Sequence, residues 1–177
     1  MKTEELILRL SEGNRRYRER SDAALRESTA LHGQHPHTIV IACSDSRVIP
    51  EQIFDAALGE LFVIRVAGNV LEKHQLGSVE YAAAHLGCSL VIVLGHTRCG
   101  AVAAALDGHS DGFIQYITDE ISAAIGDERD PLRACEKNVL HAVGRIRRDF
   151  AEHPEVKDVA VVGAVYDVLE GSVRFLD

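Results

Sequence analysis

The stretch TIVIACSDSR, residues 38–47, decides the fold. Its first five residues, Thr38–Ala42, are mostly β-branched and apolar, whereas Cys43–Arg47 are small, polar or charged. A short apolar run without alternation is typical of a parallel strand that is buried on both faces. We therefore expect a buried strand over residues 38–42, with a polar loop directly after its carboxyl end.

Two later runs have the same character. Leu61–Val66 and Leu90–Leu94 are rich in valine, isoleucine and leucine, and helical sequence follows each of them. The alternation of strands with helices predicts an α/β fold, with helices flanking a mostly parallel central sheet in an α/β/α arrangement. Because strand crossovers are right-handed, the first and third strands should lie side by side at a reversal of winding, where ligands bind in such sheets.

The other elements follow from capping and spacing signals. Pro50 is placed for the first turn of a helix over Glu51–Ala57, whereas residues 21–37, with three histidines and a proline, predict an irregular segment. The last strand, Ser172–Leu176, should pair antiparallel with Asp158–Asp167 at the edge of the sheet. Further helices are expected over residues 3–20, 76–86, 100–106, 111–125 and 131–152.

The composition is that of a folded chain with one core. The 177 residues are 46% hydrophobic and 26% charged, so we expect a single domain over residues 1–177. The net charge of −8 argues against nucleic acid as a partner, because phosphate binding needs a basic surface. No apolar run approaches the roughly 20 residues that cross a bilayer, and the first residues lack a secretory signal. We therefore expect no membrane partner and a cytoplasmic location.

Chemically useful side chains follow the first and third strands. Cys43 comes directly after the first, and His96 and Cys99 come after the third. Two thiolates and an imidazole suit zinc, and three protein ligands leave a fourth position for water, as in catalytic zinc sites. Buried structural thiols and a loop histidine are the alternative interpretation, which suits each residue alone better than the three together. A redox pair would need Cys-x-x-Cys, which the sequence lacks.

Five motifs are spread along the chain. They are CSDSR (43–47), RVAGN (65–69), SVEYA (78–82), GHTRCGA (95–101) and VVGAVYD (161–167). Together they closely resemble the β-class carbonic anhydrases. Several spaced motifs in the same order make the resemblance specific, and it covers roughly half of the chain strongly.

The resemblance implies an enzyme, a carbonic anhydrase of the lyase class, with one zinc ion per subunit. Its zinc ligands would be Cys43, His96 and Cys99, and Asp45 and Arg47 would form a catalytic pair beside the metal. The reaction would be the reversible hydration of carbon dioxide to bicarbonate and a proton, by attack of zinc-bound hydroxide. The family also implies a homo-oligomer, either a dimer or a dimer of dimers. The apolar face of the N-terminal helix fits packing on a partner subunit.

Chemistry gives Asp45 and Arg47 their expected roles. An unrestrained carboxylate beside zinc would coordinate the metal, so Asp45 needs a partner, and the Arg47 guanidinium can hold it with two hydrogen bonds. Restrained in this way, Asp45 can orient the attacking water. In the family, a closed and bicarbonate-regulated form carries tryptophan three residues before its first cysteine ligand. That residue is Val40 here, and the chain contains no tryptophan, so we expect an open site.

The substrate pocket is expected to include Gln34, Phe62, Tyr81 and Gly100. The resemblance implies that the amide of Gln34 contacts the substrate, and that the rings of Phe62 and Tyr81 reach the pocket across a dimer interface. Plain core packing is the alternative for the two aromatic residues. Gly100 lies near a helix start, where its backbone amide is suited to hold an anion.

Two other functions are compatible with the sequence. Related enzymes use the same zinc site to hydrolyse carbonyl sulfide or carbon disulfide, and the shape of the pocket would decide between these substrates and carbon dioxide. A zinc-holding module without turnover is the other hypothesis. The pair Asp45 and Arg47 argues against it, because a purely structural zinc would have a fourth protein ligand.

Overall fold

The computed structural model describes residues 2–176 and divides into two compact units, one ending at Gln34 and one beginning at His35. The N-terminal unit consists of two helices, α1 (Thr3–Arg20) and α2 (Ala23–His32). Neither helix contains a buried residue. The helix over residues 3–20 is as expected.

The expectation of an irregular segment over residues 21–37 is wrong, because α2 occupies most of it. Asp22 begins this helix: its side-chain Oδ1 accepts a hydrogen bond of 3.0 Å from the backbone N–H of Leu25. A carboxylate in this position satisfies one of the free N–H groups of the first turn. The helix therefore forms despite the composition that predicted an irregular segment, and it ends at His32, with Gly33 as its C-cap.

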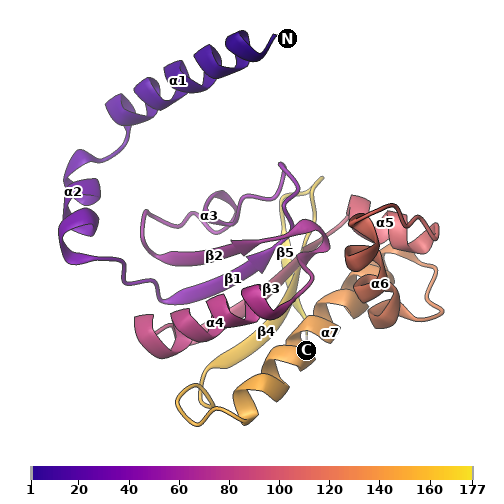
Figure 1. Ribbon diagram of the computed structural model, residues 1–177. Coiled ribbons are helices and arrows are strands. Elements are labelled where there is room, and N and C mark those ends of the chain that lie inside the picture. Colours follow the sequence, from indigo (N-terminus) through magenta and orange to yellow (C-terminus); the bar gives the residue numbers. More distant parts are fainter. Residues whose placement is uncertain (1, 177) are drawn as a thin grey trace. The chain divides into compact units, whose positions relative to one another are not determined.

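The unit that begins at His35 is built on a five-stranded sheet with the order β2-β1-β3-β4-β5 (Figure 1). The first four strands are parallel, and β5 pairs antiparallel with β4 at the edge, as expected. β1 therefore lies between β2 and β3, which creates the predicted reversal of winding between β1 and β3. The strands are β1 (Thr38–Ala42), β2 (Leu61–Arg65), β3 (Leu90–His96), β4 (Ala160–Tyr166) and β5 (Val173–Leu176).

Helices connect the strands, and α4 and α7 lie along one face of the sheet (Figure 1). The helix expected over Glu51–Ala57 is shorter than predicted: it ends at Ile53, and the chain takes a left-handed conformation at Asp55 (φ 49°). None of the helices within residues 2–176 is both long and apolar enough to span a bilayer. The helical elements are α3 (Pro50–Ile53), the short 3₁₀ turn η1 (Ala67–Asn69), α4 (Lys73–Leu86), α5 (Gly100–Leu106), α6 (Ile114–Ile125) and α7 (Pro131–Ala151).

Both faces of β1 are buried, which explains its unbroken apolar sequence. Ile39 and Ile41 belong to the core that also includes residues of α4 and α7. Val40 and Ala42 point to the opposite face, where they pack with residues of β3 and with Val48. Cys43 belongs to a third apolar cluster, formed with residues of α5, α6 and α7. The residue that follows the end of β1 is therefore packed against these three helices.

Two glycines let α7 approach the backbone of the central strands. A Cβ atom on Gly95 of β3 would lie 2.5 Å from Val139 Cγ2 and 2.9 Å from Cys135 Sγ. A Cβ atom on Gly163 of β4 would lie 2.8 Å from Val139 Cγ1. These distances leave no room for a side chain, so the helix packs directly on the two strands. This contact fixes α7 next to the end of β3.

Replacing Gly95 by alanine should therefore destabilise the protein by about 1–3 kcal/mol, through overpacking of the core. Gly77→Ala is the matched control, because Gly77 lies within α4 and a Cβ atom there would meet nothing within 4 Å. Alanine in a helix interior should stabilise by about 0.5–1 kcal/mol. Denaturant unfolding at one protein concentration measures both changes. A midpoint for Gly95→Ala equal to that of the wild type would contradict the close packing.

Candidate metal centre

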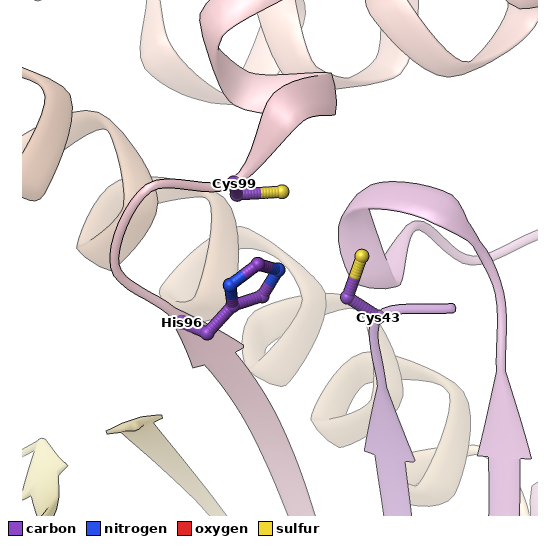
Figure 2. Close-up of side chains that lie close together, drawn as sticks. All are labelled: Cys43, His96 and Cys99. Atoms are coloured by element: carbon purple, nitrogen blue, oxygen red, sulfur yellow. The ribbon is translucent and has the colours of Figure 1, made fainter. Parts of the chain in front are cut away.

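Cys43, His96 and Cys99 meet at the carboxyl edge of the sheet. Cys43 follows the last residue of β1, His96 ends β3, and Cys99 precedes the first residue of α5. All three are buried, and their ligand atoms lie within 4.8 Å of one another. Figure 2 shows the two sulfur atoms and the imidazole ring turned toward a common space. The arrangement follows from the parallel pairing of β1 with β3, which brings the ends of both strands to one place.

The imidazole of His96 presents one free nitrogen to this space. Its Nδ1 lies 3.0 Å from the carbonyl oxygen of Thr97 and can only donate to it. A neutral ring then carries an unprotonated Nε2, which is buried and has no hydrogen-bond partner among residues 2–176. Burying such an atom without a partner costs free energy, so the ring is set up to bind a cation.

The two thiols act as a pair in the protein without metal. A hydrogen bond between the Cys99 and Cys43 side chains lowers the pKa of Cys43 well below that of a free thiol. The same hydrogen bond raises the pKa of Cys99, and burial adds to this rise. The pair therefore favours a charged sulfur on Cys43, and a cation bound between the two would displace the proton of Cys99. Two thiolates with one neutral imidazole are a donor set that fits zinc.

Backbone groups around Cys43 are held in place by a residue that the sequence analysis did not single out. The Arg65 guanidinium donates from Nε to the Cys43 carbonyl at 3.1 Å and from Nη2 to the Asp45 carbonyl at 2.6 Å. In addition, the backbone N–H groups of Asp45 and Gly68 lie 3.4 and 3.3 Å from Cys43 Sγ. A charged residue at the end of an apolar strand was the available signal for Arg65.

Asp45 and Arg47 form the two-pronged pair that their spacing predicts. Arg47 Nε lies 2.9 Å from Asp45 Oδ1, and Nη2 lies 2.7 Å from Oδ2. The backbone N–H of Arg47 also donates to Oδ1, at 2.9 Å. These hydrogen bonds hold the pKa of Asp45 well below its ordinary value of 3.8. The carboxylate is therefore ionised and fixed at neutral pH, and the Nη2 group of Arg47 reaches the Arg98 carbonyl at 3.3 Å.

Of the expected substrate residues in the unit that begins at His35, Gly100 directly follows the ligand Cys99, whereas the register of the sheet places Phe62 away from the ends of the strands. Phe62 and Tyr81 lie together, with ring centroids 6.4 Å apart, but Phe62 is aligned with Ile39 in the sheet register. That alignment leaves it four residues short of Cys43, or about 13 Å along the strand. Gln34 is exposed at the end of the N-terminal unit. Gly100 begins α5, where a Cβ atom would meet nothing within 4 Å. Their roles stay predictions.

The fold and this cluster together define a class of protein. It is the class of α/β proteins that gather metal-binding thiols and an imidazole at the switch point of a mostly parallel sheet. The family model described as carbonic anhydrase matches residues 38–173. The chain therefore belongs to the carbonic anhydrase family, in its β class, and is an enzyme of that family.

Known relatives agree over nearly the whole length of the chain. Carbonic anhydrase 2 of Mycobacterium tuberculosis is 33% identical, over 95% of this chain and 90% of the relative. The crystal structure of the β-carbonic anhydrase CafA of Aspergillus fumigatus is similar with a TM-score of 0.85 at 27% identity, covering 98% of this chain and 91% of that one. The structure of the β-carbonic anhydrase CcaA is similar with a TM-score of 0.81 at 28% identity, covering 98% and 88%.

Proposed function

We propose that this enzyme catalyses the reversible hydration of carbon dioxide to bicarbonate and a proton, with one zinc ion per subunit. The observation that carries the proposal is the convergence of Cys43, His96 and Cys99 beside a carboxylate that Arg47 holds on both oxygens. A purely structural zinc would have four protein ligands, and this cluster offers three. The family assignment supports the same reaction.

The ligands of the metal would be the Sγ atoms of Cys43 and Cys99 and Nε2 of His96. Zinc held there would lower the pKa of a coordinated water toward neutrality, an effect for which carbonic anhydrases are the standard example, and would so supply the nucleophile. The backbone N–H groups of Asp45 and Gly68 stabilise the charge on the Cys43 sulfur. The hydrogen bond from His96 Nδ1 to the Thr97 carbonyl keeps Nε2 free for binding.

In this proposal Asp45 orients the attacking water, and Arg47 keeps Asp45 in place. Oδ1 of Asp45 already accepts two hydrogen bonds from Arg47, whereas Oδ2 accepts one. Each carboxylate oxygen can accept two hydrogen bonds, so Oδ2 can still accept one from the attacking water. Because Arg47 engages both oxygens, Asp45 is restrained from binding the metal itself. This arrangement supports the open form of the site.

The test is stopped-flow hydration of carbon dioxide by the zinc-loaded protein between pH 6.5 and 9. Two thiolates offset more of the metal's charge than neutral ligands would, so hydration should rise across this range. Asp45 cannot cause the rise, because its lowered pKa keeps it ionised throughout. A profile already flat and maximal at pH 6.5 would contradict this view. Zinc-loaded protein without hydration would instead favour a binding module.

We also propose that the functional assembly is a homo-oligomer, a dimer or a dimer of dimers. Apolar side chains of α1 are exposed: Leu6 is 41% exposed, and Leu10 is 74% exposed. A second copy of the chain is the partner that would bury them. In such an assembly residues 1–177 act as one domain, and Gln34, Phe62, Tyr81 and Gly100 complete the pocket.

The proposed location is the cytoplasm. The four cysteines are free of disulfides, which suits a reducing compartment.

A further inference from the structure

A buried amide on α7 connects this helix to the loop beside the metal ligands. Asn138 is buried on the face of α7 that also carries Cys135, Val139 and Ala142. Its side-chain Nδ2 donates a hydrogen bond of 2.8 Å to the backbone carbonyl of Gly68, a residue 70 positions earlier in the chain. A polar side chain among apolar neighbours costs free energy unless it is paired, so this contact accounts for the amide at position 138.

Gly68 joins Asn138 to the metal site through its own backbone. Its N–H lies 3.3 Å from Cys43 Sγ, while its carbonyl accepts the hydrogen bond from Asn138. The residue takes a left-handed conformation (φ 68°). A Cβ atom there would lie 2.7 Å from Ile121 Cδ1 and 3.1 Å from Ala101 Cβ. Side chains of α5 and α6 therefore pack closely against Gly68. Both its N–H and its carbonyl have a hydrogen-bond partner.

We propose that Asn138 is a positioning residue of the metal centre: by holding the Gly68 carbonyl, it keeps the Gly68 N–H directed at the Cys43 sulfur. This inference rests on the proposed zinc function. A hydrogen bond to a ligating thiolate withdraws charge from the sulfur and fixes its direction, and such outer partners tune metal affinity. Of the two N–H groups near the sulfur, that of Asp45 is local to the Cys43 loop. That of Gly68 depends on a contact from α7.

The test compares Asn138→Ala with Thr118→Ala. Thr118 is likewise buried on a helix, but its hydroxyl donates only to the carbonyls of Ile114 and Gln115 in the same helix. The control therefore removes a buried hydroxyl without removing a hydrogen bond to the carbonyl of Gly68. Zinc affinity is measured by competition with a chelator. It should fall about 10- to 100-fold in Asn138→Ala and stay near the wild-type value in Thr118→Ala.

Substitution of cobalt(II) for zinc gives a second readout that is independent of activity. Loss of a hydrogen bond to the sulfur raises the energy of its lone pairs, so the sulfur-to-cobalt charge-transfer band should move to lower energy in Asn138→Ala and not in Thr118→Ala. If Asn138→Ala does not fold, Asn138→Ser takes its place, because serine is too short to reach the Gly68 carbonyl at the same distance, and its band should move in the same direction.

The proposal is overturned if a folded variant at position 138 keeps the zinc affinity and the cobalt band of the wild type. A lower melting temperature alone would not support it, because Asn138 would then only join α7 to the loop. The outcome is separable from that of the proposed reaction. Wild-type protein that binds both metals and fails to hydrate carbon dioxide would refute the reaction, while the affinity and the band would still decide the role of Asn138.

Discussion

Cys43→Ser is expected to remove zinc and activity together. A serine hydroxyl stays protonated at neutral pH and is not among the usual zinc ligands, whereas the surroundings of Cys43 favour the charged sulfur. Zinc affinity should fall by more than about 100-fold, because even the loss of a partner outside the ligand set costs 10- to 100-fold. Hydration of carbon dioxide should fall to the background rate. Metal analysis after dialysis and stopped-flow hydration measure the two losses.

Cys88→Ser is the control for this change. Cys88 is also a buried free cysteine, and its Sγ–H donates to the Pro36 carbonyl at 3.2 Å. Serine keeps a donor at that position, and the residue lies outside the cluster of ligands. This variant should retain full zinc content and full hydration. A Cys43→Ser protein that still held one zinc per chain would show that Cys43 is not a ligand.

The placement of Cys43 and His96 could be predicted because it depends on local signals and one topological rule. The apolar runs that become β1 and β3 are continuous, so they indicate buried parallel strands without knowledge of their partners. Right-handed crossovers then bring the two strand ends together. The pairing of β1 with β3 confirms that step. The hydrophobic pattern and chain topology therefore suffice to gather the three donors.

Arg65 and Asn138 were missed for the opposite reason. Their partners lie far away in the sequence: Arg65 holds the carbonyl of Cys43, 22 residues earlier, and Asn138 holds that of Gly68, 70 residues earlier. No local pattern records such a contact. The local signal for Asn138 was a polar residue on an apolar helical face, because Asn138 lies between Cys135 and Val139 on the buried side of α7.

The substrate pocket is the part that one chain leaves least determined. Phe62 and Tyr81 contact each other on the side of β2 and α4. The register of the sheet keeps Phe62 away from the ends of the strands. An aromatic residue on a strand packs equally well in a core or an interface, so its sequence context does not separate the two. A ring that reaches a pocket across a dimer interface has its contacts in the partner subunit, so no pattern within one chain predicts them.

Asp45→Asn should separate catalysis from metal binding. Asparagine keeps the size of the side chain but loses the charge that Arg47 holds through Nε and Nη2, and it presents an NH₂ group where a carboxylate oxygen accepted hydrogen bonds. The turnover number should fall by about 100-fold, at the low end of the effect of proton-handling groups. Zinc content should be unchanged, because Asp45 is not one of the three donors.

The matched control is Asp130→Asn. Asp130 caps α7 by accepting a hydrogen bond of 2.9 Å from the backbone N–H of Arg133, and asparagine caps a helix equally well. Its hydration rate should therefore equal that of the wild type. Full turnover in Asp45→Asn with zinc bound would show that the pair with Arg47 is only a salt bridge of the loop.

The pH dependence of Asp45→Asn provides an independent check. The hydrogen bonds from Arg47 lower the pKa of Asp45 in the folded protein. The ionised carboxylate therefore stabilises the folded state fully when the pH is above 3.8, the ordinary pKa of this group, and this contribution is lost as the pH falls through the lower pKa of the folded state. The stability difference between wild type and Asp45→Asn should thus be full at pH 7 and shrink in acid. Between pH 6.5 and 9 the wild-type residue stays ionised. The variant should therefore be slower by the same factor at every pH, and a factor that changed across this range would assign the titration to Asp45 itself.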